Sequence, residues 1–67
     1  MQRETDRTGL YQLLLVACRA ALALGQYRTA YHSLEAACAC ARSAGKWEWL
    51  DEVATTAKQL ERAAPRR

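Results

Sequence analysis

Hydrophobic and polar residues recur along this chain with the period of an α-helix, and glycines divide the pattern into three segments. Gly25 and Gly45 each follow a run of apolar positions, where a glycine ends a helix by taking a left-handed conformation. Thr8 is a suitable N-terminal cap for the first helix. The three predicted helices span residues 8–24, 27–44 and 47–63.

The two ends of the chain are predicted to lie outside the helical domain. Residues 1–7 are polar after Met1 and carry balanced charge, which is typical of a frayed tail. Pro65 cannot continue a helix and is followed by two arginines. We therefore expect a flexible tail over residues 1–7, one three-helix domain over 8–64 and a C-terminal tail over 65–67.

The second and third helices each show one apolar face when residues are placed at about 100° per step. On the third helix this face comprises Trp49, Leu50, Val53, Ala57 and Leu60. On the second it is a narrow seam of Tyr27, Ala30, Tyr31, Leu34, Ala37, Cys38 and Ala41. Small residues let helices approach closely. The pattern predicts an all-α fold, an antiparallel helical hairpin plus a third helix.

The first helix is apolar around most of its circumference. One face carries Leu10, Leu13, Leu14, Ala17, Ala21 and Leu24, and we expect the alanine seam to cover one such face. A second apolar set continues it around the side, with Tyr11, Leu15, Cys18 and Leu22. Only Gln12 and Arg19 mark a polar edge. A helix this apolar needs two neighbours to cover it.

Charge and hydropathy argue against nucleic-acid and membrane partners. The formal net charge is +3 over 67 residues, and two positive charges belong to the C-terminal arginines. Basic residues do not gather on one face, as nucleic-acid binding would require. The apolar run over residues 10–24 is short for a membrane span and is interrupted by Gln12 and Arg19. With no signal peptide visible, we expect a cytoplasmic protein.

The candidate chemistry of the chain is weak. The three cysteines and the single histidine are not spaced so that their side chains point at one metal ion or reactive centre. Residues two apart in a helix, such as Cys38 and Cys40, point about 200° away from each other. Cys38 is predicted to be a small core residue and Cys40 to be exposed and oxidisable. The carboxylates follow a surface stripe on the third helix. We expect no metal, no cofactor, no catalytic residue and no enzymatic activity.

A helix-turn-helix is one alternative, since Ala21 and Gly25 have the spacing of that DNA-binding motif. Gln26 stands where the motif usually has an apolar residue. The second helix also offers mainly alanine, with Arg28 and His32, to a DNA groove. We therefore favour helix–helix packing over DNA binding as the role of this stretch.

The stretch from Gly25 to Gly45 resembles the tetratricopeptide repeat family. Gly25-Gln26-Tyr27-Arg28-Thr29-Ala30, followed by Leu34 and Ala37, matches the family's spacing, and Ala41-Arg42-Ser43-Ala44-Gly45 is similar to its longer-repeat variants. The resemblance covers residues 11–60, about one and a half repeats. Leu14, Cys18 and Ala21 depart from the family's usual tryptophan, glycine and tyrosine. A microtubule-interacting-and-transport domain is a similar three-helix alternative.

The resemblance implies a non-catalytic module for protein–protein interaction or assembly, which acts as a scaffold for a partner protein or peptide. In the family the first helix of each repeat lines the concave peptide-binding face. That face would here include Gln12, Leu15, Arg19 and Leu22.

A self-association surface is also predicted. About three repeats are normally needed to bury the faces of such units. We therefore expect a symmetric homodimer. Its predicted interface comprises Tyr11, Leu15, Leu22, Trp47 and Trp49.

Overall fold

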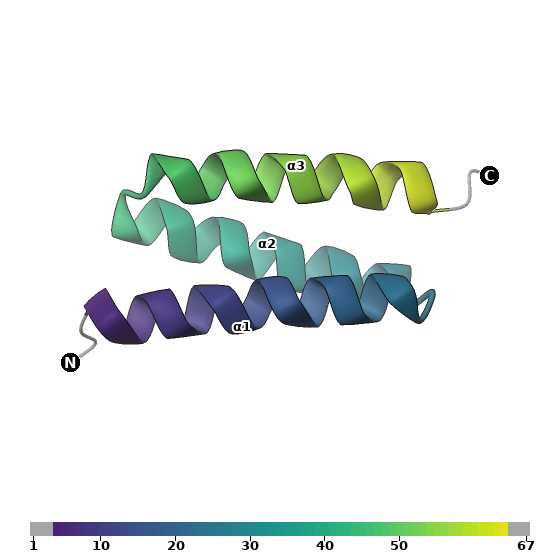
Figure 1. The fold of residues 1–67 in the computed structure, drawn as a ribbon, viewed down its shortest axis with the longest axis horizontal. Coiled ribbons are helices and arrows are strands. Elements are labelled where there is room, and N and C mark those ends of the chain that lie inside the picture. The colour runs from purple at the N-terminus through teal and green to yellow at the C-terminus, as the bar shows by residue number, and fades with distance from the viewer. Residues whose placement is uncertain (1–3, 65–67) are drawn as a thin grey trace.

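The computed structural model describes residues 4–64, with side chains from residue 7 onward, and this part of the chain contains helices and no strands. The helices are α1 (Glu4–Ala23), α2 (Tyr27–Ala44) and α3 (Trp47–Ala63). They lie side by side, with α2 between the other two and antiparallel to both (Figure 1). The fold is all-α, and the predicted helical hairpin plus third helix is confirmed.

Both connections between helices turn on a glycine. The φ angle is +73° at Gly25 and +67° at Gly45. After α1, the N–H of Gln26 donates to the Ala21 carbonyl at 2.8 Å, and the N–H of Gly25 donates to the Leu22 carbonyl at 3.1 Å. The same two bonds recur at Gly45. This pair of bonds satisfies carbonyls that would otherwise lack partners at a helix end.

α1 begins at Glu4 rather than at Thr8, so residues 4–7 of the predicted tail belong to the helix. Polar sequence does not exclude a helix, and acidic residues near a helix N-terminus interact favourably with its dipole. Residues 1–3 and the predicted C-terminal tail, 65–67, lie outside the described residues. The C-terminal limit of the helical domain agrees with expectation, since α3 ends at Ala63.

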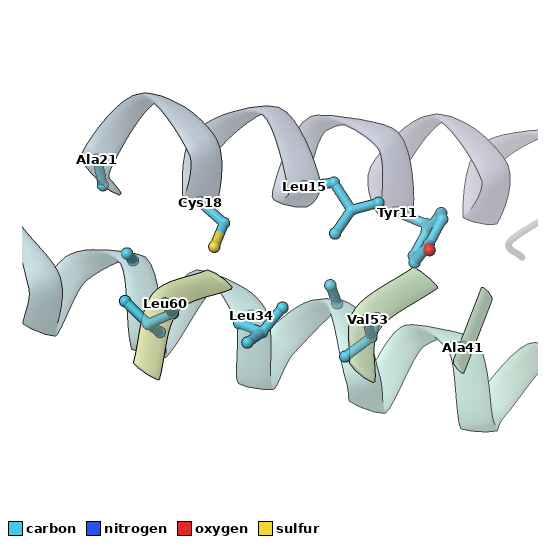
Figure 2. Close-up of a cluster of buried hydrophobic side chains, with 10 residues drawn as sticks. Tyr11, Leu15, Cys18, Ala21, Leu34, Ala41, Val53 and Leu60 are labelled. Carbon is cyan, nitrogen blue, oxygen red and sulfur yellow. The ribbon is translucent and has the colours of Figure 1, made fainter. Parts of the chain in front are cut away.

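The interface between α1 and α2 is closely packed because small residues line it. Ala30, Ala37 and Ala41 of α2 are fully buried. Figure 2 shows the side chains of α1 that point toward this seam: Tyr11, Leu15, Cys18 and Ala21. The small alanine side chains therefore let the α1 backbone lie close to α2, as the sequence predicted.

α3 packs mainly on α2 and contacts α1 much less. Val53, Thr56 and Leu60 are its buried residues. The Thr56 hydroxyl donates to the Glu52 carbonyl at 2.9 Å, so this buried polar group has a partner within its own helix. The chain measures 42 × 19 × 14 Å. A layer of helices this thin leaves helix faces uncovered.

The structure also shows which of the two apolar faces of α1 the alanine seam covers, a choice that the sequence left open. The buried face is the one that carries Tyr11, Leu15 and Cys18. Tyr11 fits there because α3 supplies both a stacking ring and hydrogen-bond acceptors for it. Leu10 and Leu13 lie on the other side of α1 and are exposed.

Candidate interaction surfaces

The residues predicted to bind a partner do not form one open surface. Gln12 and Arg19 are exposed at the polar edge of α1, as expected. Leu15 is only 1% exposed, and Leu22 is half-buried against the core. Because α1 turns its Leu15 side toward α2, a partner would reach the polar edge but not the leucines predicted to frame it.

The predicted dimer interface is likewise split between the interior and the surface. Tyr11 and Leu15 lie inside the protomer and are unavailable to a second copy. Trp49 is half-buried and packs on the core, whereas Trp47 is 74% exposed. The two tryptophans therefore point to opposite sides of α3, as their spacing of two residues predicts.

Tyr11 of α1 and Trp49 of α3 meet where these two helices contact each other. The rings of Tyr11 and Trp49 stack with centroids 4.4 Å apart and planes within 7° of parallel. The Tyr11 hydroxyl donates to Glu52 Oε1 at 2.5 Å and lies 3.1 Å from the Trp49 carbonyl oxygen. Burial and the bond to Glu52 raise the pKa of Tyr11 well above its usual range. This constellation holds α3 onto α1.

An exposed apolar surface lies on α1 and its C-terminal turn. We call it the outer face of α1, and it comprises Leu10, Leu13, Val16, Ala17, Ala20 and Leu24. Its four large side chains are 43–77% exposed. At about 100° per residue they fall within an arc of roughly 120°. Leu10, Leu13, Ala17 and Leu24 belong to the apolar face predicted from the sequence, whereas Leu14 and Ala21 of that predicted face pack against or within the core. Helical phase alone does not reveal which of these residues face outward.

A second apolar surface is a groove between α2 and α3, with a volume of about 390 Å³. We call it the α2–α3 groove, and it is lined by Tyr31, Leu34, Glu35, Cys38, Val53, Ala57, Leu60, Glu61 and Ala64. No residue of α1 lines it. The only charged residues on its walls are two glutamates, one on each helix. Sequence reasoning missed this groove because it arises only where two helices meet.

The three cysteines lie in different surroundings. Cys18 is buried in the core, and burial raises the pKa of its thiol. Cys38 lines the groove, whereas the Cys40 thiol donates to the Arg7 carbonyl at 3.5 Å. Both are half-buried, so the prediction of an exposed Cys40 is wrong. Because α1 begins at Glu4, its first turns cover the side of α2 that carries Cys40.

The remaining chemistry of the described residues is sparse. His32 is exposed, and its Nδ1 lies 3.4 Å from Glu35 Oε1 one helical turn away. Residues 7–64 contain no cluster of three or more histidine, cysteine or acidic side chains placed to hold a metal ion. None of the helices described is long and apolar enough to cross a membrane.

Comparisons of this chain with known protein families, with curated proteins and with solved structures found no match.

Proposed function

We propose that this protein is a non-catalytic assembly module of the tetratricopeptide-like kind, which self-associates through the outer face of α1. The observation that carries the proposal is the exposure of Leu10, Leu13, Val16 and Leu24 along one side of α1 and the turn that follows it. Contiguous apolar patches of this kind on a small protein usually mark an interaction site.

The size of the surface sets the strength of the association. Burying a large aliphatic side chain completely contributes about 1.5–3 kcal/mol. Scaled by the exposures of the four large residues, the outer face offers on the order of 4–7 kcal/mol. Association costs about 4–15 kcal/mol in lost freedom of motion. The outer face alone therefore supports weak binding, and a tighter complex needs a complementary surface on the other partner.

The polar side chains of the described residues support binding rather than catalysis. His32 meets only Glu35, on the exposed side of α2, instead of a nucleophile or a second carboxylate within a pocket. The buried Tyr11 hydroxyl is engaged by Glu52 and is sealed against α3. The His32 imidazole is thus solvated and the Tyr11 hydroxyl is committed to packing, so neither is placed for general acid–base catalysis.

Sedimentation equilibrium over micromolar to millimolar concentrations tests the proposal. We expect reversible association of the wild-type chain and weaker association of Leu13→Gln. Trp47→Gln is the matched control, because Trp47 is equally exposed but lies on α3, away from the outer face. Circular dichroism should show that both variants keep their helices. A chain that stays monomeric throughout, or an association that Leu13→Gln leaves unchanged, contradicts the proposal.

A further inference from the structure

We propose that the outer face of α1 in one copy docks into the α2–α3 groove of another copy, so that the chain assembles head to tail. This inference rests on the proposed self-association and names the surface that receives the outer face. Each contact joins the outer face of one copy to the groove of the next, so both apolar surfaces of the chain are used.

The shapes of the two surfaces are compatible. An amphipathic helix that binds a groove does so through residues spaced i, i+3, i+4 and i+7. On the outer face, Leu13, Val16, Ala17 and Ala20 have this spacing and are exposed. The small residues Cys38 and Ala57 leave room between the larger side chains of the groove. A ridge of leucine, valine and alanine can therefore enter a groove of about 390 Å³.

The charges of the two surfaces are complementary. Among the described side chains of α1, residues 7–23, the charged ones are Arg7 and Arg19. The charged residues of the groove are Glu35 and Glu61, one on each wall. Arg19 lies beside the outer face, where its long side chain can reach a carboxylate at the groove's rim. The pairing of Glu35 with His32 occurs at the surface and leaves the second carboxylate oxygen available.

A symmetric contact between two α1 helices does not bring Arg19 to the glutamates of a groove. It would place the outer faces of two helices together, with Arg19 beside the outer face on each of them. It would also leave both α2–α3 grooves open. Docking into the groove covers both kinds of apolar surface instead of one kind and sets arginine against glutamate, which favours the unsymmetrical contact.

The arrangement has a consequence for assembly. The outer face belongs to α1 and the groove is lined only by α2 and α3, so one copy can use both surfaces at the same time. A contact between two different surfaces grows into a chain or closes into a ring, whereas a two-fold contact stops at a dimer. The proposed interface therefore predicts species larger than dimers at high concentration.

Mixing two variants separates the two kinds of contact. Leu13→Gln damages the outer face without adding a charge, and Glu35→Arg with Glu61→Arg damages the groove; all three positions are exposed. We expect each variant to associate at least about tenfold more weakly than wild type. An equimolar mixture should form a 1:1 complex, since one intact face and one intact groove remain, and this complex should not grow further. Glu48→Arg with Asp51→Arg applies the same charge change outside the groove and should behave as wild type.

Thiol labelling gives a second measurement on the wild-type chain. Cys38 lies in the groove and Cys40 does not, although both are half-buried. Association should slow alkylation of Cys38 as the protein concentration rises and leave that of Cys40 unchanged. If the rim variant fails to fold, Ala57→Phe fills the groove with an apolar ring and takes its place in the mixture.

The possible results distinguish this inference from the proposed function. A mixture that associates no better than its separate components, while wild type still self-associates, overturns the docking into the groove and leaves self-association in place. Equal slowing of alkylation at Cys38 and Cys40 also overturns it. A wild-type chain that remains monomeric removes both proposals.

Discussion

The contact between Tyr11 and α3 provides the sharpest stability prediction. Tyr11→Phe keeps the aromatic ring, and with it the stack on Trp49, and removes only the hydroxyl that reaches Glu52. Because the ring stays in place, no large cavity forms. The change therefore isolates the hydrogen bond that joins α1 to α3.

The expected loss follows from the partners of the hydroxyl. A hydrogen bond to a charged group contributes about 1.5–3 kcal/mol. The Glu52 side chain is exposed and regains water when the bond is lost, which favours the lower end of that range. We therefore expect Tyr11→Phe to lower the free energy of unfolding by about 1.5 kcal/mol. For a domain of this size, a loss of about 1.5 kcal/mol should lower the melting temperature by roughly 6–12 °C. This is a large share of the total stability, because a core this small supplies only about 3–5 kcal/mol.

Thermal and urea unfolding of the dilute protein measure this loss. Tyr31→Phe is the matched control, because Tyr31 is 57% exposed and its replacement should change stability by less than about 0.5 kcal/mol. A double-mutant cycle with Glu52→Ala, which removes the acceptor, should return a coupling energy of comparable size. Equal effects of Tyr11→Phe and Tyr31→Phe would refute the reasoning, as would additivity of Tyr11→Phe with Glu52→Ala.

Two further predictions concern pH and backbone conformation. The pKa of Tyr11 is raised from its ordinary value of 10.0, so the unfolded chain loses that proton first as the pH rises past 10. Wild-type stability should then fall by up to about 1.4 kcal/mol per pH unit relative to Tyr11→Phe, and parallel pH profiles would contradict this. Gly45→Ala should destabilise by about 1 kcal/mol, because φ is +67° and a Cβ there meets no atom within 4 Å. Gly9→Ala, at an exposed helical glycine with equal space, should instead stabilise by about 0.5–1 kcal/mol in the same unfolding assay.

The helices and the seam between α1 and α2 were predictable because they depend on local rules. Glycine takes a left-handed conformation without steric cost, so Gly25 and Gly45 end their helices wherever the rest of the chain lies. The alanines of α2 recur on one face, and all three named for close packing are buried. The start of α1 was not predictable to this precision, since polar residues are compatible with both a tail and a first helical turn.

The two interaction surfaces depend on a choice that periodicity does not make. α1 is apolar on both sides, so its hydrophobic pattern is satisfied whether Leu13 or Leu15 is buried. The ring and carboxylate of α3 decide the matter, because only the Tyr11 side of α1 can use them. The sequence by itself determined three helices, their glycine ends and the alanine seam, since each depends on neighbours in the chain. Only the packing of α1 and α3 on α2 determined that Leu10, Leu13 and Val16 face outward and that a groove opens between α2 and α3, since both depend on residues far apart in the sequence.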